Sequence, residues 1–348
     1  MMRCTTKSME SISKDLSFKS LYWSQPGSSL LHIGVHGSNL TCFHPVGDVR
    51  PFHSKGPSKN ICFILGYCSG LILIFVHGCF CVANPVTKKF RFLDYPMLQT
   101  KKSIGFAVDK IDESTQRFKI VCITEAAASN PSETMYGFHI NAGNSWKISK
   151  TKITCISSDL MRDMKPVYFQ EGLYWLRSDG NIITFNPKTE KARLIPTKLN
   201  HQAGAKLLLG ADDNHLTLIS ATEEMIYVYS LENIFTDPKW ILTRQIKNEP
   251  VHEIMLSCWY VEAFDGRHVL VRAKDEIEDV IYGYDLKANM WEVMGLLPGW
   301  CDAGRDLYQF KPSWYPVIGL QNQNNSFRSE REVSIEVIME LIHGHFRT

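Results

Sequence analysis

PVYFQEGLYWLRSDGNIITFNPKTEKARLIP, at residues 166–196, reads as four short strands joined by three polar turns. The strands are VYF, LYWLR, NIITF and ARLIP, and the turns are Glu171-Gly172, Ser178-Asp179-Gly180 and the NPKT sequence that begins at Asn186. Glycine supplies the positive φ that such tight turns require. Apolar residues run almost continuously through the middle strands, which is expected where both faces of a sheet are covered. The stretch therefore predicts a four-stranded antiparallel sheet buried between neighbours.

The last turn of this stretch recurs along the chain. NPVTKKFRFL begins at residue 84, NAGNSWKIS at 141 and DLKANMWEVMGLLP at 285, each after a short apolar run. SLENIFTDPKWILT at 230–243 is a degenerate copy, and FHPVGDVRPF at 43–52 adds a sixth mark. A recurrence of about 50 residues built from strands is typical of a β-propeller with four-stranded blades. We therefore expect an all-β, kelch-like β-propeller of about six four-stranded blades, with a short C-terminal helix.

Particular residues in the repeat have architectural roles in this interpretation. Asn84 and Asn186 can accept a hydrogen bond from the backbone two residues on, which fixes the turn. Trp146 and Trp291 open the returning strands, where an aromatic ring can lie over the neighbouring blade. We expect all four residues to serve the architecture of the propeller.

The two ends of the propeller are expected to meet. The propeller domain is predicted over 21–322. We expect the strand at 311–320 to supply or extend a sheet that also contains the strand around 30–35. Ring closure of this kind removes the free sheet edges. Residues 323–348 are predicted to be a linker and an amphipathic helix that begins at Ser329-Glu-Arg-Glu332 and is dispensable for folding. Its apolar stripe consists of Ile335, Ile338, Met339, Ile342 and Phe346.

Composition excludes several classes of partner. The chain has 348 residues with 38 Lys and Arg against 36 Asp and Glu, and it lacks a run of like charges, so we expect neither nucleic acid nor a membrane as partner. The N-terminus lacks a secretory pattern, so a cytoplasmic or nuclear location is expected. The apolar run at 61–82 is interrupted by Gly66, Gly70 and His77-Gly78, which favours a buried hairpin over a membrane helix. The cysteines in and near it, Cys62, Cys68, Cys79 and Cys81, are expected to be reduced and buried.

A search for catalytic and metal-binding motifs yields no candidate. The sequence has no G-x-S-x-G elbow, no H-E-x-x-H, no Walker-type loop and no G-x-G-x-x-G after a strand. His343 and His345 form the closest histidine pair, and chance spacing explains it better than a metal site does. Asp212-Asp213 and the acidic stretch at 275–279 are interpreted as solvated hairpin tips. We therefore predict no catalytic residues, no cofactor and no metal.

Five segments in order resemble the plant F-box proteins that carry a kelch-type F-box-associated propeller. GYCSGLILI with NPVTKKFRFL resembles the family's "GSCNGL" strand and "NPxTxxFRxLP" turn, and GFAVDKIDESTQRFKIV at 105–121 is similar to its "GFGYDxxTDDYKVV" segment. FHINAGNSWK, the blade at 166–196 and MIYVYSLENIFTDPKWILTRQI resemble the three that follow. The resemblance runs from about residue 16 to residue 320.

The resemblance implies a substrate-recognition subunit of an SCF-type ubiquitin ligase, which presents target proteins and has no catalytic residue of its own. SISKDLSFKSLYW at 11–23 is similar to the segment that closes the family's F-box. Residues 1–20 are therefore expected to be the trailing edge of an F-box, mostly disordered or helical, without its docking helices. A Skp-type adaptor and a cullin are implied as partners only if an F-box is present upstream.

A second class of function stays open from the residues alone. A propeller can bind a small molecule or a glycan in its central channel, or hydrolyse one there, if titratable groups converge at the channel mouth, and fold does not decide between the classes. For a protein partner, the candidate loops are 157–165, 198–205, 275–279 and 298–305. Trp300 and Arg305 in the last loop are the candidate partner-binding residues, because these residue types often dominate interface energies. The alternative for Trp300 is that it folds under the loop and covers the channel mouth.

Overall fold

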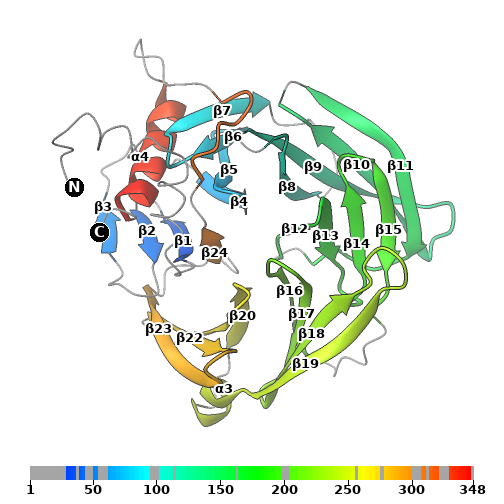
Figure 1. Cartoon of the computed structure of the whole chain (residues 1–348), viewed down its shortest axis with the longest axis vertical. Helices are drawn as coiled ribbons and strands as arrows, with labels where there is room; N and C mark the ends of the chain where they lie inside the picture. The colour runs from blue at the N-terminus through cyan, green and yellow to red at the C-terminus, as the bar shows by residue number, and fades with distance from the viewer. Residues whose placement is uncertain are drawn as a thin grey trace.

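The computed structural model describes residues 29–36, 39–43, 50–53, 62–94, 102–112, 115–143, 145–161, 164–197, 204–254, 258–274, 278–298, 307–310, 313–320 and 329–345. Its strands form four-stranded antiparallel sheets arranged around a central axis (Figure 1). The prediction of an all-β propeller with four-stranded blades is therefore confirmed.

Five blades are described with their side chains, and we number them in chain order. The first contains β4 (Cys62–Cys68), β5 (Leu71–Val76), β6 (Cys79–Asn84) and β7 (Lys89–Asp94). The second contains β8 (Lys102–Lys110), β9 (Gln116–Ala127), β10 (Glu133–Asn141) and β11 (Trp146–Ile156). The third contains β12 (Val167–Phe169), β13 (Gly172–Leu176), β14 (Ile182–Asn186) and β15 (Lys191–Ile195).

The fourth blade contains β16 (Lys206–Ala211), β17 (Leu216–Ala221), β18 (Met225–Glu232) and β19 (Lys239–Lys247). The short helix α3 (Glu249–Ile254) leads into the fifth, which contains β20 (Trp259–Phe264), β21 (His268–Ala273), β22 (Glu278–Asp285) and β23 (Met290–Pro298). In each blade the strand nearest the axis comes first in the chain and the fourth strand lies at the rim (Figure 1).

The two ends of the propeller share a further four-stranded sheet, which is described by its backbone pairing alone. Its order is β24-β1-β2-β3, from β24 (Leu307–Phe310), β1 (Ser29–His36), β2 (Asn39–Phe43) and β3 (Arg50–His53). Leu31 lies opposite Tyr308 in the antiparallel register of β1 and β24. An N-terminal strand thus pairs with a C-terminal one, as predicted, but the pairing segment is 307–310 and not 311–320.

Residues 313–320, which we call the strap, cross the first two blades instead of extending a sheet. The side-chain amide of Asn84 donates to the carbonyl of Ser313 at 3.0 Å. The backbone N–H of Gln116 donates to Pro316 O at 2.9 Å, and the N–H of Ile318 donates to Gln116 O at 3.0 Å. Pro316 has no backbone N–H of its own, so this segment makes one isolated bridge where a ladder would need several. The predicted strand at 311–320 is therefore wrong within its described part.

The repeated turn behaves as its sequence predicts. The side-chain oxygen of Asn84 accepts the N–H groups of Val86 and Thr87 at 3.0 and 3.1 Å. Asn186 accepts those of Lys188 and Thr189 at 2.8 and 2.9 Å. This local bonding fixes the reversal between the third and fourth strands of the first and third blades.

One turn reaches its geometry differently. Between β12 and β13 the positive φ values belong to Gln170 (42°) and Glu171 (63°), and Gly172 does not share them. Gly172 is required for a different reason, because a Cβ there would lie 2.9 Å from the ring of Tyr174. The sequence-based assignment of positive φ to Gly172 is therefore wrong.

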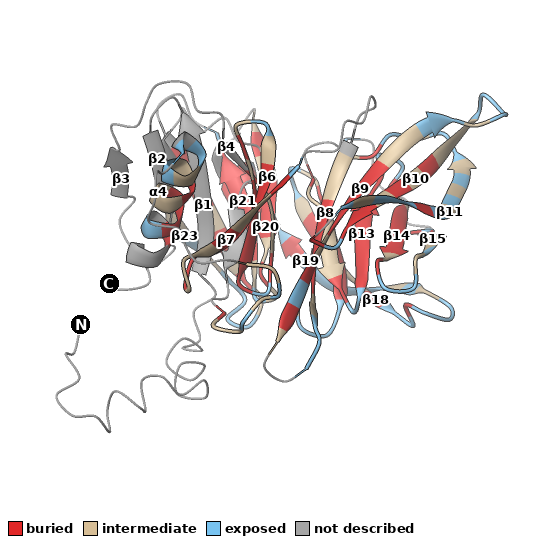
Figure 2. Cartoon of the chain, turned by 90° about the horizontal axis from the view of Figure 1, so that it is seen from above, coloured by how far each residue is buried: buried red, intermediate tan, exposed pale blue. Residues whose placement is uncertain are grey.

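Neighbouring blades bury their apolar faces against each other, and buried residues concentrate on the inner strands (Figure 2). Leu71, Leu73 and Phe80 of the first blade pack with Phe118 and Ile120 of the second. A larger cluster joins the third, fourth and fifth blades. Because each blade has a covering neighbour, its middle strands can be apolar on both faces, which explains the continuous runs in the sequence.

The helix α4 (Glu330–His345) covers the other face of the first blade. Ile335, Ile338, Met339 and Ile342 are at most 2% exposed and pack with residues of β5 and β6 such as Ile72, Ile74 and Cys81. The backbone N–H of Ser329 donates to the Glu332 carboxylate at 2.8 Å and the N–H of Glu332 donates to Ser329 Oγ at 3.4 Å, so a capping box forms at the predicted start of the helix. The predicted helix is confirmed, and its burial argues against the prediction that the tail is dispensable.

The apolar run at 61–82 forms β4, β5 and the start of β6, as predicted for a buried hairpin. His77 and Gly78 make the turn with φ values of 46° and 80°. Cys68 and Cys81 are buried free thiols, as predicted, whereas the free thiol of Cys79 is only partly buried and the side chain of Cys62 lies outside the described residues. In the part of the chain that the structure describes, no helix has the length and apolarity needed to cross a membrane.

Candidate functional site

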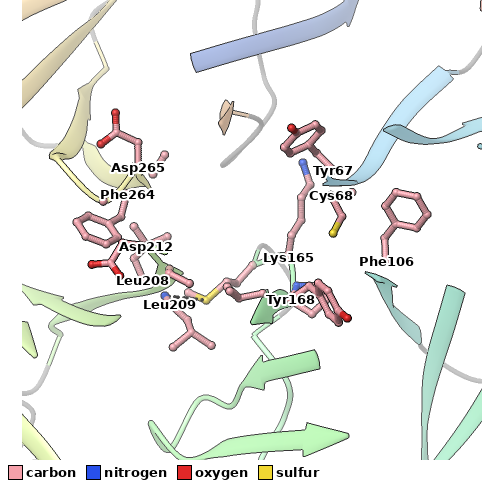
Figure 3. A pocket seen from close by; sticks show the side chains of 18 of the residues that line it. Tyr67, Cys68, Phe106, Lys165, Tyr168, Leu208, Leu209, Asp212, Phe264 and Asp265 are labelled. Carbon is pink, nitrogen blue, oxygen red and sulfur yellow. Dashed lines mark hydrogen bonds between the residues drawn. The ribbon is translucent and has the colours of Figure 1, made fainter. Parts of the chain in front are cut away.

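The innermost strands surround a cavity of ≈ 640 Å³ on the propeller axis. It is lined by β4, β8, β12, β16 and β20 and by the hairpin turns that follow β16 and β20. A volume of this order suits a small ligand or a few side chains of a protein partner. We therefore take this channel as the candidate functional site (Figure 3).

Aromatic residues form one wall of the channel. Figure 3 shows Tyr67 and Cys68 from β4, Phe106 from β8 and Tyr168 from β12 on the side opposite Asp212 and Asp265. The Tyr168 hydroxyl donates to Asp109 Oδ1 at 2.5 Å; burial, with this hydrogen bond, raises the pKa of Tyr168 above its ordinary value. The Tyr67 hydroxyl accepts the backbone N–H of Gly70 at 3.0 Å. The first bond joins β12 of the third blade to β8 of the second, and the second bond fixes the turn that follows β4.

Cys68 on this wall carries a thiol, a group that can act as a nucleophile. It is 8% exposed, and burial raises the pKa of its thiol to about 12. The thiolate is the reactive form of cysteine, so this thiol stays protonated near neutral pH and is chemically inert.

The opposite wall carries two hairpin tips of the same design. Asp212 accepts the backbone N–H groups of Asn214 and His215 at 2.7 and 2.6 Å. Asp265 accepts the N–H of Arg267 at 2.8 Å and that of His268 at 2.5 Å. A Cβ on Gly266 would lie 2.9 Å from the Cβ of Asp212, so the two tips lie against each other.

Each tip therefore follows an Asp-x-x-His pattern, DDNH at 212–215 and DGRH at 265–268, that sequence reasoning missed. The equal spacing within two adjacent blades is the signal that could have revealed it. The interpretation of Asp212-Asp213 as a hairpin tip is confirmed. The Asp212 carboxylate accepts the hydrogen bonds that form the turn, and it also places a negative charge at the channel mouth.

The His268 side chain lacks the surroundings of a catalytic base. Its Nδ1 lies 2.9 Å from Asp265 Oδ2. Its Nε2 faces Asp285 at 3.9 Å and Glu292 at 3.7 Å, where a triad would place a hydroxyl or thiol. Arg267 donates through Nε to Asp285 at 2.9 Å, and this bond holds the pKa of Asp285 well below its usual range. These charged side chains form an electrostatic network that connects β21 to β22 and β23.

Metal binding has no support among the described residues, where no three His, Cys, Asp or Glu side chains gather as a ligand set.

Trp300 and Arg305, the predicted partner-binding residues, lie outside the described residues. Of the other predicted loops, residues 157–161, 164–165, 204–205 and 278–279 are described. Asp279 belongs to β22, is 1% exposed and lies 3.4 Å from the guanidinium of Arg272, so the interpretation of 275–279 as a solvated hairpin tip is wrong within its described part. In the loop at 157–165, Lys165 lines the channel (Figure 3). The backbone N–H of Leu160 in this loop donates to Glu125 at 3.3 Å.

The pattern of the F-box associated beta propeller domain matches residues 49–257, which is more than half of the chain. The chain belongs to this family.

The curated relatives of this F-box associated propeller come from Arabidopsis thaliana. An F-box/kelch-repeat protein is 54% identical over 329 residues, spanning 93% of this chain and 75% of the relative. An F-box protein is 45% identical over 339 residues, spanning 90% and 80%. Among solved structures, the fucose-specific lectin of Aleuria aurantia aligns with a TM-score of 0.41 at 9% identity, over 76% of this chain and 92% of the lectin.

Proposed function

We propose that this chain is the substrate-recognition subunit of an SCF-type ubiquitin ligase and that it binds its target without catalysing a reaction. Membership of the F-box associated propeller family carries the proposal, because relatives named F-box proteins match across 93% and 90% of this chain. The ring, with the sheet ordered β24-β1-β2-β3 taken as its sixth blade, is the rigid support for the target-binding surface.

The chemistry of the channel supports a binding role. Its cysteine is a buried, protonated thiol, and Asp212 and Asp265 accept turn-forming hydrogen bonds. Nucleophilic catalysis needs an activated nucleophile beside a base, and the described channel residues do not make that pair. We therefore assign the channel mouth to recognition of a target, and Trp300 and Arg305 stay predicted contributors to it.

The ligase contact would run through a Skp-type adaptor and a cullin wherever an F-box is joined to this propeller. The experiment is affinity purification of the full gene product, expressed from its own promoter in plant cells, with mass spectrometry of the copurified proteins. Copurification of the adaptor and the cullin is expected, and the site of action would be the cytoplasm or the nucleus. Recovery of targets without adaptor or cullin would contradict the proposed ligase role.

The second candidate is binding of a small molecule or glycan in the channel, and the cavity of ≈ 640 Å³ is the observation that favours it. Thermal denaturation in the presence of a panel of sugars and plant metabolites distinguishes the two candidates. A ligand that raises the melting temperature, and loses this effect in Phe106→Ala, would favour the small-molecule function. No shift across the panel, together with capture of target proteins, is the result expected for the receptor.

A further inference from the structure

The rim of the second, third and fourth blades has an uneven charge. We call "basic rim" the outer strands β11, β15 and β19 with the turns that lead into them, residues 142–156, 187–196 and 233–247. These segments contain nine Lys and Arg residues against two acidic ones, although the whole chain has a net charge of +2. The cations are Lys147, Lys150, Lys152, Lys188, Lys191, Arg193, Lys239, Arg244 and Lys247; the acids are Glu190 and Asp237.

The three outer strands follow one another along the edge of the ring (Figure 1). The Thr151 hydroxyl on β11 donates to Glu190 O beside β15 at 2.5 Å. Arg193 on β15 donates to Phe235 O at 3.2 Å, and Phe235 lies in the turn before β19. The basic rim is therefore one connected surface.

Most of this positive charge is available to a partner. Within the described residues, five of the cations form no ion pair and are exposed, namely Lys150, Lys152, Lys191, Arg244 and Lys247. Lys147, Lys188 and Lys239 each pair with one carboxylate at the surface. Surface pairs of this kind contribute little and are easily exchanged for another carboxylate.

Exposed apolar side chains lie among these cations. Ile148 and Ile156 on β11 are 71% and 77% exposed, and Phe235 is 66% exposed. Ile241 and Leu242 on β19 are also exposed. Soluble proteins avoid placing large apolar groups together at a surface unless a partner covers them.

Protection of sheet edges explains only part of this composition. Lysine on an outer strand discourages edge-to-edge pairing, but exposed isoleucines on the same strand work against that purpose. The outer strand of the fifth blade and its turn, 286–298, carry one lysine and one glutamate, Lys287 and Glu292. A rim strand of this fold therefore does not need an excess of positive charge.

We propose that the basic rim docks an extended acidic polypeptide segment with aliphatic side chains, supplied by the target. Carboxylates of such a segment would meet the unpaired cations, and its aliphatic side chains would cover Ile148 and Ile156. A nucleic acid would leave these isoleucines uncovered, and nucleic-acid surfaces use stacking aromatic side chains and Arg more than aliphatic ones. This inference rests on the proposed function, because it states which chemistry the receptor would read in its target.

The test measures binding of a labelled acidic peptide, in which Asp and Glu alternate with Leu, to the full chain by fluorescence anisotropy. A peptide with Asn and Gln in place of the acids is the matched probe. The double variant Lys150→Glu/Lys152→Glu is expected to weaken binding about tenfold or more, and added salt should weaken wild-type binding. Lys287→Glu on the neutral rim strand is the control and should bind like the wild type.

Ile156→Ser separates apolar contact from charge alone, and a severalfold loss of affinity is expected. The inference is overturned if the wild-type chain does not distinguish the acidic peptide from the Asn/Gln peptide, or if Lys150→Glu/Lys152→Glu binds normally. It is also overturned if double-stranded DNA or vesicles of anionic lipid bind as tightly as the peptide and Ile156→Ser has no effect. If the peptide-binding test fails while the adaptor and the cullin still copurify with the chain, the proposed ligase role is unaffected.

Discussion

The indole N–H of Trp146 in the second blade donates to the main-chain carbonyl of Asp94 at the end of the first blade, at 2.8 Å. Trp291 in the fifth blade makes the same contact with Lys247 O at the end of the fourth blade, at 3.1 Å. The tryptophan that opens an outer strand therefore holds the last residue of the preceding outer strand. The architectural role predicted for both tryptophans is confirmed.

Trp146→Phe should keep most of the packing against Phe80 and lose this hydrogen bond. We expect a loss of about 1 kcal/mol in the free energy of unfolding, measured by urea denaturation. Ile148→Ala, on the same strand with a side chain 71% exposed, is the control and should unfold like the wild type. Equal stability of Trp146→Phe and wild type would show that the indole contact is incidental.

Ile338→Ala on α4 should destabilise the propeller. The side chain is 2% exposed between the helix and the first blade, so its truncation leaves a cavity and should cost about 2–5 kcal/mol. Val333→Ala, 41% exposed on the same helix, is the matched control. Wild-type urea midpoints for both variants would restore the view that the tail is dispensable.

Gly70→Ala should be more costly than Gly78→Ala, although both glycines have nearly the same φ, 81° and 80°. A Cβ on Gly78 meets nothing within 4 Å, so that variant carries only the backbone cost of about 1 kcal/mol. A Cβ on Gly70 would lie 2.6 Å from the backbone nitrogen of Ser313 and would displace the strap. Thermal denaturation of the two variants compares them directly, and equal losses would refute close packing of the strap.

The Arg267–Asp285 bond should make stability depend on pH in the acid range. The pKa of Asp285 is lower in the folded protein than in the unfolded chain, so its contribution is present above the unfolded pKa of about 4. It is lost as the pH falls through the folded pKa. Arg267→Met should therefore lower the urea midpoint at pH 7 and converge with the wild type at the acid end. Lys239→Met, which removes an exposed ion pair with Asp237, is the control and should leave the urea midpoint nearly unchanged. A difference in urea midpoint between Arg267→Met and the wild type that is the same at all pH values would contradict the role of Asp285.

The sequence predicts local structure well here because each blade repeats the same local chemistry. Asn84 and Asn186 make their turns with neighbours two and three residues away, so the pattern can be read without the rest of the fold. Contacts between distant segments carry no such signal. The bond from Asn84 to Ser313 and the closing pair β1 and β24 join residues more than two hundred positions apart, which is why the sequence alone wrongly predicts a strand in the strap at 313–320.

The candidate site was harder to predict for the same reason. Asp212 and Asp265 come from different blades, and packing of the fourth blade against the fifth brings their turns together at the channel mouth. The charge of the basic rim is likewise invisible in the sequence, because its cations are spread over three blades and no run of like charge appears.

If this propeller selects proteins for ubiquitination, the proteins that it captures should have half-lives that depend on it. Proteins cross-linked to the chain in plant cells would be followed by pulse-chase in wild-type cells, in cells that lack the gene and in cells rescued with it. We expect longer half-lives in cells without the gene and wild-type half-lives after rescue. Unchanged half-lives, with capture intact, would contradict it.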